Sequence, residues 1–144
     1  MLNQFFTLKV NDQLCSAMIS GALILACLLF SKISLAEPVS FKGQVLPVLM
    51  DRCSVCHMRE DSHGYLVIDE EYAYIALVNV PSFTLPKMKR VEPGDPQLSY
   101  FWLKITGEHL DAGGQGWAMP YMTKLNKKEK KLIYDWIAQG AKDN

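Results

Sequence analysis

Two cysteines and a histidine stand together in one short stretch of the chain, Cys53-Ser54-Val55-Cys56-His57. On a helical turn, two thiols three positions apart can reach the two vinyl groups of one porphyrin and form thioethers. The histidine that follows directly then lies where a ring nitrogen can bind the iron. The spacing therefore predicts covalent attachment of one haem c, with Cys53 and Cys56 as thioether residues and His57 as the proximal iron ligand.

Three other uses of a Cys-x-x-Cys pair compete with haem attachment. A dithiol redox site normally opens a helix after a strand, and no strand pattern precedes Cys53. A zinc site needs a second Cys or His pair at ligand spacing, and the sequence has none downstream. A disulfide across so short a loop is strained. Cys53 and Cys56 are the only cysteines after residue 36, which favours haem c over these alternatives.

The sixth iron ligand has to come from another part of the chain. Met119 is favoured because it follows the stretch Gly113-Gly114-Gln115-Gly116-Trp117-Ala118 and precedes Pro120. Glycines let a backbone fold closely over a flat ligand, and proline stiffens the segment just after the thioether. The sequence therefore predicts Met119 as the distal ligand, with a packing methionine as the alternative. The other candidates are Met122, His109, His63, Met50, Met58 and Met88.

The first 36 residues have the pattern of a targeting segment. Ala17 to Phe30 is an apolar run of signal-peptide length, shorter than the about 20 residues that span a bilayer. Ser34-Leu35-Ala36 places small residues at the two positions that a signal peptidase reads, which predicts cleavage after Ala36. We therefore expect export to the periplasm or another extracytoplasmic space. An uncleaved membrane anchor and lipidation at Cys27 are the alternatives.

Composition limits the remaining classes of function. The 144 residues carry 15 Lys and Arg against 15 Asp and Glu, and 49% of them are hydrophobic. A chain without excess positive charge lacks the basic surface of a nucleic-acid binder, and its hydrophobic content excludes a disordered chain. Outside the N-terminal run the sequence is too polar for a membrane bundle. We expect residues 1–36 to be the signal peptide or anchor, and residues 37–144 to form one domain.

The elements that must position the predicted ligands have helical patterns. Ser40 can cap a first helix that runs into Cys53 and that Pro47 kinks. After the motif, Gly64 to Ile68 has an extended pattern. Asp69 can then cap a second helix over residues 70–78. The first half of the domain is thus predicted to be two helices separated by a loop.

The second half of the domain has clearer helix signals. Asp95-Pro96 is a capping residue followed by proline at the first helical position, and it starts a third helix. Asn126-Lys127-Lys128-Glu129 resembles a capping box with Asn in place of Ser or Thr. It opens a last helix that Gly140 ends. We therefore predict an all-α domain with loops.

These motifs, taken in order, resemble those of class I c-type cytochromes. The matches are a helix over 41–53, the Cys-x-x-Cys-His motif, Met119-Pro120 in a late loop, and a last helix over 127–139. A narrower resemblance is to the small single-haem domains known as planctomycete-type cytochrome c. Their apolar-Pro-apolar helix, Pro-Gly-Asp-Pro-x-x-Ser turn, Met-Pro pair and final Trp-Ile-x-x-Gly-Ala match 45–49, 93–99, 119–120 and 136–141. The resemblance covers nearly all of 40–142. It departs at Ser62-His63-Gly64-Tyr65-Leu66, where such domains often have Gly-Gly-Leu.

The resemblance implies a cytochrome c-like fold, with about four helices wrapped around one covalently attached haem. Iron ligated by His57 and Met119 has no open position, which suits an electron carrier rather than an enzyme. In so small a domain the porphyrin would form much of the core, so we expect a poorly folded haem-free form. The alternatives are a haem c sensor or gas-binding module with a displaceable sixth ligand, and a peroxidase-like enzyme using His109 with Glu108.

Basic residues suggest where a redox protein partner would dock. Lysines cluster over Lys124–Lys131, at the start of the predicted last helix, and a second basic run contains Lys87, Lys89 and Arg90. Either group can steer an acidic partner, and a solvated helix face is the alternative. We expect no nucleic-acid partner, and membrane contact only through a retained N-terminal anchor.

Overall fold

The structure is a computed structural model that describes residues 37–58 and 63–144. The predicted signal peptide over residues 1–36, including Cys27, lies outside the described residues. Glu37 to Asn144 form one compact unit. Its elements in chain order are η1 (Phe41–Val45), α2 (Leu46–Arg52), α3 (Ser54–His57), η2 (His63–Tyr65), α4 (Ala73–Leu77), α5 (Tyr100–Thr106), η3 (Glu108–Leu110) and α6 (Lys127–Ala138).

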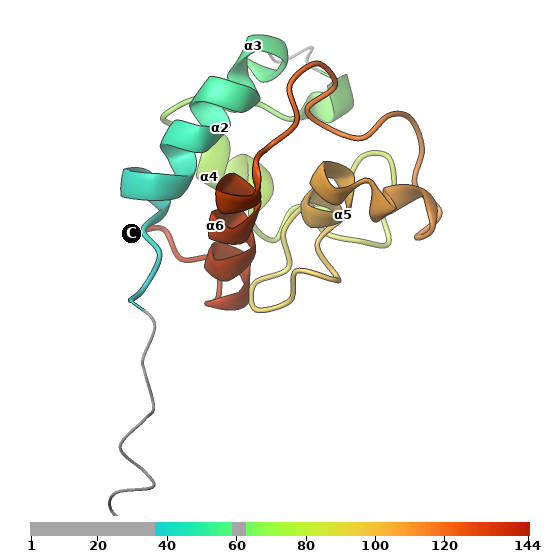
Figure 1. The fold of residues 1–144 in the computed structure, drawn as a ribbon. Coiled ribbons are helices and arrows are strands. Elements are labelled where there is room, and N and C mark those ends of the chain that lie inside the picture. Colours follow the sequence, from blue (N-terminus) through green and yellow to red (C-terminus); the bar gives the residue numbers. More distant parts are fainter. Residues whose placement is uncertain (1–36, 59–62) are drawn as a thin grey trace, which may run out of the picture. The chain divides into compact units, whose positions relative to one another are not determined.

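Helix dominates this unit. Helices account for 44% of the described residues and bridge residues for 7%, and the bridges are isolated pairs rather than a sheet. The predicted all-α class is therefore confirmed (Figure 1).

Within residues 37–58 and 63–144, no helix combines the length and the apolar character needed to cross a bilayer.

The N-terminal helical segment leads directly into the cysteine motif. The Ser40 hydroxyl accepts the Gly43 N–H at 3.0 Å, as expected of a cap. A single π-helical turn, η1, then changes to the α-helix α2 at Leu46. Pro47 is the second residue of α2, directly after this change, and lacks the N–H that would continue the hydrogen bonding of η1. The predicted first helix is therefore two helical segments that meet next to the proline.

The stretch after the motif departs from the extended prediction for Gly64–Ile68. Gly64 and Tyr65 have φ angles of 71° and 51°, both in the left-handed region, and belong to the short turn η2. Asp69 Oδ1 accepts the N–H groups of Glu71 and Tyr72 at 3.0 and 2.6 Å, but these residues form a turn before the helix, so the predicted helix cap at Asp69 is wrong. The α-helix that follows is shorter than predicted, since α4 begins only at Ala73.

Short backbone bridges join α4 to α5. Val78 pairs with Val91, and Lys89 pairs with both Pro81 and Ser99. A turn precedes α5, and Asp95 caps it by accepting two backbone N–H groups through Oδ1. The third helix therefore starts four residues later than the Asp95-Pro96 pattern predicted, because these residues form a turn of their own.

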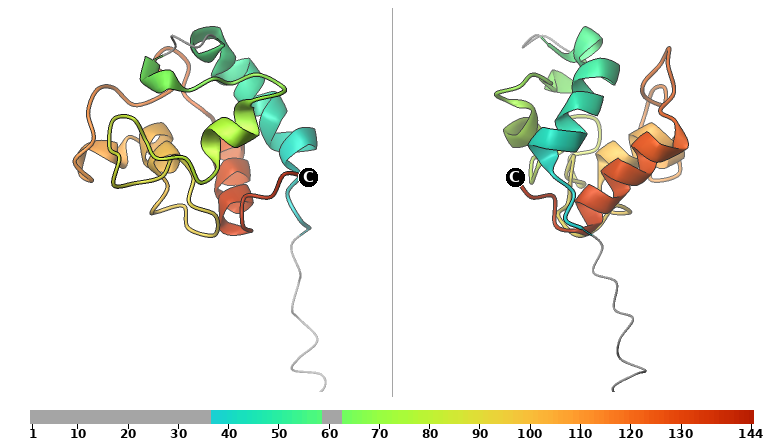
Figure 2. Two further views of the ribbon diagram at one scale, coloured as in Figure 1. Left: turned by 180° about the vertical axis from the view of Figure 1, so that it is seen from behind. Right: turned by 60° about the vertical axis from the view of Figure 1, so that its left-hand side comes forward.

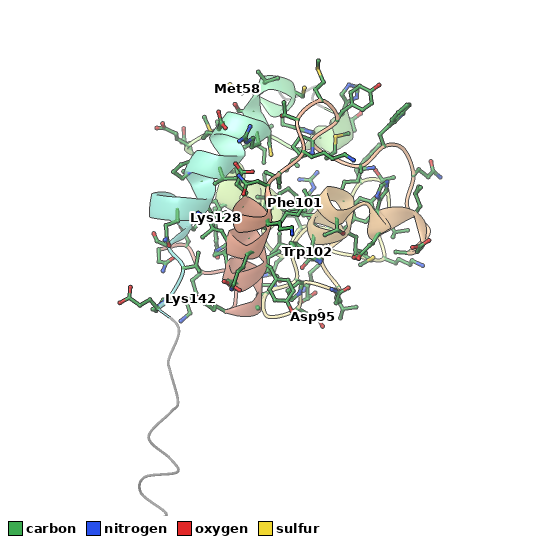
Figure 3. The ribbon with its side chains drawn as sticks, viewed as in Figure 1. Met58, Asp95, Phe101, Trp102, Lys128 and Lys142 are labelled. Carbon is green, nitrogen blue, oxygen red and sulfur yellow. The ribbon has the colours of Figure 1, made fainter. Side chains whose placement is uncertain are left out.

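The hydrophobic core lies between the two ends of the unit. Phe41 of η1 packs on Trp136 of α6 with ring centroids 5.1 Å apart, and both side chains are buried. The chain end is tied to the same place, because the Lys42 N–H donates to the Asn144 carbonyl at 2.9 Å. Trp102 of α5 meets Tyr134 of α6 edge to face at 5.2 Å. Figure 3 shows Phe101 and Trp102 between α5 and α6.

The last helix, α6, begins and ends as predicted. Asn126 Oδ1 accepts the N–H groups of Lys128 and Glu129, and Glu129 Oε2 accepts the Asn126 N–H at 2.7 Å. This reciprocal pair is a complete capping box. Gly140, at a φ of 98°, follows the helix in the left-handed conformation typical of a C-terminal cap.

Candidate functional site

The cysteine motif forms one helical turn at the end of α2. The Cys53 N–H donates to the Leu49 carbonyl at 2.8 Å, and the Cys56 N–H donates to the Cys53 carbonyl at 3.2 Å. Cys56 and His57 belong to α3, which Cys53 precedes. Both thiols are free, with Cys53 half-buried and Cys56 exposed. The turn thus presents two unpaired thiols and an imidazole close together, which is what thioether attachment of a porphyrin needs.

His57 is oriented by a backbone carbonyl from the loop that follows it. Its Nδ1 lies 3.1 Å from the Leu66 carbonyl oxygen. A carbonyl oxygen only accepts, so Nδ1 carries the proton, and the lone pair of Nε2 is left for a metal. Burial lowers the pKa of His57; the Leu66 hydrogen bond opposes this shift, and the charges of His63 and Arg90 add to it. The neutral imidazole that binds metals is therefore the favoured form.

The environment of Cys53 argues against a dithiol redox site. Burial, with a smaller contribution from the charge of Cys56, raises the pKa of the Cys53 thiol to about 12. A reactive redox cysteine needs the opposite, a lowered pKa that populates the thiolate.

The zinc alternative has no support among the described residues. Residues 37–58 and 63–144 contain no group of three His, Cys, Asp or Glu side chains that could hold a metal ion.

Met119 lies on a segment that α5 and η3 hold through hydrogen bonds. Its N–H donates to the Lys104 carbonyl at 2.9 Å. The Lys104 ammonium donates to the Gln115 carbonyl at 2.6 Å, and His109 Nε2 donates to the Gly116 carbonyl at 2.9 Å. Figures 1 and 2 show the segment 111–126 rising toward the end of the unit where α3 lies. The predicted ligands thus fall into two groups, three on one turn and Met119 on a second segment.

The glycines before Met119 are required by the shape of this segment. Gly113 and Gly116 have φ angles of 90° and 75°, in the region that favours glycine. Gly114 allows a close approach, because a Cβ there would lie 2.7 Å from both the His109 carbonyl oxygen and the Tyr100 hydroxyl. The glycine-rich stretch is therefore a backbone requirement at all three positions.

Burial and contacts separate Met119 from most, but not all, of the other candidates for the distal ligand. Met119 is half-buried, whereas Met122 is 89% exposed and Met58 is also exposed. Met50 packs against the hydrophobic core. His109 is 1% exposed and its Nε2 is engaged by Gly116, so it supports the Met119 segment. His63 is exposed and Met88 is half-buried.

The residues around the two ligand-bearing segments fit a large apolar group that also carries polar oxygens. Trp117 and Tyr121, on either side of Met119, are 68% and 62% exposed and contact each other edge to face. Tyr65 and Phe83 form a second exposed pair, next to Leu66. Both pairs present apolar surface that a bound ligand could cover. The Tyr100 hydroxyl is buried without a hydrogen-bond partner in the described part of the chain, and it would suit an acceptor such as a haem carboxylate.

Sequence reasoning missed the groups that orient the predicted ligands. The partner of His57 is the Leu66 carbonyl, and the partner of the Met119 N–H is the Lys104 carbonyl. Every residue has a carbonyl, so no residue type marks these positions. Arg90 was grouped with a basic surface run, but its half-buried guanidinium donates to backbone carbonyls. No sequence signal set Arg90 apart from the two lysines of that run.

Comparison with known proteins found no relative of this chain. No protein family, no curated protein and no solved structure matches this chain.

Proposed function

We propose that this chain is a single-haem c-type cytochrome that carries electrons one at a time and is not itself an enzyme. The observation that carries the proposal is the helical turn of Cys53, Cys56 and His57, in which the Leu66 carbonyl holds Nδ1–H of the histidine. Two free thiols and an imidazole with an available Nε2 form the donor set that haem c needs.

Each residue of the site has a defined role in this proposal. Cys53 and Cys56 would form the two thioethers with the haem, and Nε2 of His57 would bind the iron. Met119 supplies the distal thioether sulfur, which donates weakly to ferric iron and so raises the reduction potential relative to a second imidazole. Haem c, when bound, supplies one-electron oxidation and reduction at its iron. The hydrogen bonds that hold the Met119 segment on α5 and η3 support a fixed sixth ligand.

We further propose a cytochrome c-like fold around the haem. The supporting observations are the packing of η1 on α6 through Phe41 and Trp136 and the order of the motifs along the chain. The exposed aromatic pairs beside the ligand-bearing segments fit the same arrangement, since haem would cover apolar surface there.

The proposed partner is an acidic redox protein in the periplasm or another extracytoplasmic space. Lys124, Lys127 and Lys128 are exposed at the start of α6, close in sequence to the exposed Tyr121 and Met122. Positive charge beside apolar surface favours fast, salt-sensitive encounter with an acidic surface. Figure 3 shows Lys128 on α6. Lys131 contributes less, because it pairs with Asp135.

A covalent-haem assay followed by a ferric spectrum tests the proposal. The protein, produced with a haem c maturation system, should keep haem on a denaturing gel. Its ferric form should show the weak near-infrared charge-transfer band of a sulfur–iron bond. Met119→Ala should abolish this band and lower the reduction potential, because the weak donor is lost. The matched control is Met122→Ala, which removes a methionine three residues away that is exposed to solvent.

Each result has a distinct meaning for the proposal. Absence of covalent haem would overturn it. A high-spin, five-coordinate ferric spectrum would favour the sensor or peroxidase alternatives instead. Loss of the band in Met122→Ala but not in Met119→Ala would transfer the distal role to Met122.

A further inference from the structure

Arg90 points its guanidinium into the domain and donates to three backbone carbonyls. Nη1 donates to the Ala76 carbonyl at 2.7 Å, and Nη2 donates to the Gly64 and Tyr65 carbonyls at 2.8 and 3.0 Å. Ala76 belongs to α4, whereas Gly64 and Tyr65 belong to η2. One side chain therefore ties the turn after the cysteine motif to the neighbouring helix.

The backbone of Arg90 is itself held on both sides. Its N–H donates to the Val80 carbonyl at 2.7 Å, and its carbonyl accepts the Phe101 N–H at 2.8 Å. The guanidinium thus extends from a fixed point that is anchored to α5. A planar guanidinium with five donors can hold several carbonyls in one geometry, which a lysine ammonium on a flexible stem cannot do.

The turn that Arg90 holds has an unfavourable backbone conformation. Tyr65 has a φ of 51° although it carries a side chain, and a non-glycine residue pays free energy in this region. Such a conformation persists only where the surroundings hold it, and it is frequently found at functional sites. The Arg90 hydrogen bonds to the Gly64 and Tyr65 carbonyls act on the two left-handed residues themselves.

The next carbonyl along the chain is the one that orients His57. The Tyr65 carbonyl belongs to the peptide group that joins Tyr65 to Leu66, and the Leu66 carbonyl accepts Nδ1–H of His57. We propose that Arg90 is a positioning residue for the proximal ligand, which fixes the 64–66 turn so that the Leu66 carbonyl can hold the His57 ring. This role in iron ligation rests on the proposed function, whereas the effect on the turn does not.

The proposal has an electronic consequence with a definite sign. A firm hydrogen bond from Nδ1–H to a carbonyl makes the imidazole a stronger donor, and a stronger donor favours ferric iron and lowers the reduction potential. Loosening the Leu66 carbonyl should therefore raise the potential. Loss of a nearby positive charge acts in the opposite direction, because positive charge favours the ferrous state.

Arg90→Lys tests the proposal because it keeps the charge and removes the guanidinium fork. We expect the reduction potential of the haem-loaded protein to rise. We also expect amide exchange of Ile68, whose N–H donates to the His57 carbonyl, to accelerate about tenfold, as for loss of a hydrogen bond to a charged group. The amides of α6 should exchange as before. The comparison of Ile68 with the amides of α6 in the same sample reports on the 64–66 turn rather than on the iron.

Lys89→Gln is the matched control for charge. Lys89 is adjacent to Arg90 and partly exposed, and it bonds Asn79 and Glu92 rather than the 64–66 turn. This variant should leave Ile68 exchange unchanged and should not raise the potential. An unchanged potential and unchanged Ile68 exchange in Arg90→Lys would overturn the positioning role, even where the haem assay and the ferric spectrum support the cytochrome.

A measurement on the unsubstituted protein tests the proposal even where the Arg90→Lys variant fails to fold. The Nη protons of Arg90 should give separate, slowly exchanging nuclear magnetic resonance signals, with cross-peaks to Gly64 and Tyr65. A guanidinium that rotates freely and exchanges rapidly with water would overturn the proposal. If the protein lacks covalent haem but Arg90→Lys still accelerates Ile68 exchange, the cytochrome proposal fails while the contact between Arg90 and the turn stands.

Discussion

Backbone carbonyls from other elements orient both predicted iron ligands. The Leu66 carbonyl accepts Nδ1–H of His57, and the Lys104 carbonyl accepts the N–H of Met119. The first contact sets the tautomer of the imidazole and the second sets the course of the segment that carries the thioether. Ligand identity is therefore a property of the side chains, whereas ligand orientation depends on the backbone around them.

A substitution at Gly64 should measure the cost of the turn that carries the Leu66 carbonyl. Gly64 has a φ of 71°, and a Cβ there would meet no atom within 4 Å. Gly64→Ala should therefore lower the free energy of unfolding by about 1 kcal/mol through backbone conformation alone. Chemical denaturation of both proteins measures the difference. Gly64→Asn is the control and should cost less, because Asn tolerates this region better; equal costs for Ala and Asn would contradict the explanation.

Among the elements, α2 and α6 are joined by one charged contact beside the cysteine motif. Arg52, the last residue of α2, donates through Nη2 to Glu129 Oε1 at 2.8 Å. Glu129 is also the residue that completes the capping box with Asn126 at the start of α6. One carboxylate thus serves a helix cap and a contact between helices. The beginning of α6 is fixed relative to the residue that precedes Cys53.

The stability that Glu129 contributes should depend on pH. The Asn126 N–H and the Arg52 guanidinium lower the pKa of Glu129 below its ordinary value of 4.5. Since the folded-state pKa is lowered, the stabilisation is present above the unfolded pKa and is lost as the pH falls through the folded pKa. Glu129→Gln can still accept the Asn126 N–H through its one amide oxygen, so the change removes the charge together with the hydrogen bonds from Arg52. It should lower the free energy of unfolding by about 0.5 kcal/mol at neutral pH.

Denaturant midpoints at neutral pH and in strong acid check this prediction, since the difference between the two proteins should vanish once Glu129 is protonated in the folded state. Glu70→Gln is the matched control, because Glu70 is exposed and has no ion pair in the described part of the chain. It should have no effect at either pH. An equal loss of stability at both pH values would show that packing, and not charge, explains Glu129.

For the molecule as a whole, the core and the site lie in different places. Phe41 and Trp136 close the core between η1 and α6, whereas Trp117 and Tyr121 remain exposed beside Met119. A chain of this size buries only a modest core of its own. Haem would bury the exposed aromatic surface, so we propose that part of the stability of the unit comes from its cofactor.

Preventing haem attachment should therefore destabilise the whole unit. Cys53→Ser combined with Cys56→Ser should lower the free energy of unfolding by about 3 kcal/mol, the value for losing burial of one or two aromatic side chains. This corresponds to a fall of about 15 °C in the thermal midpoint, which circular dichroism can measure. Val55→Ser is the control within the same motif, because Val55 is 91% exposed. The same thermal midpoint for the double variant and the control would contradict a structural role for haem.

Local patterns predicted the elements whose partners lie close in sequence. The capping box of Asn126 and Glu129 was expected and formed, because its bonds close over three residues. The predicted start of the third helix was wrong by four residues, because α5 begins at Tyr100. A cap at Asp95 is compatible with either a turn or a helix, and the bridges to Lys89 and Arg90 decide between them.

The sequence by itself determined the proposed donor set, because Cys53, Cys56 and His57 stand close together and their spacing is a property of the chain. It also singled out Met119 through the glycines and the proline around it. Only the tertiary structure decided that the Leu66 carbonyl holds His57 and that Arg90 turns inward to hold the residues before Leu66. Each contact joins a side chain to a backbone carbonyl, 9 residues away for His57 and 26 for Arg90, and a backbone carbonyl has no residue type by which a sequence could reveal it.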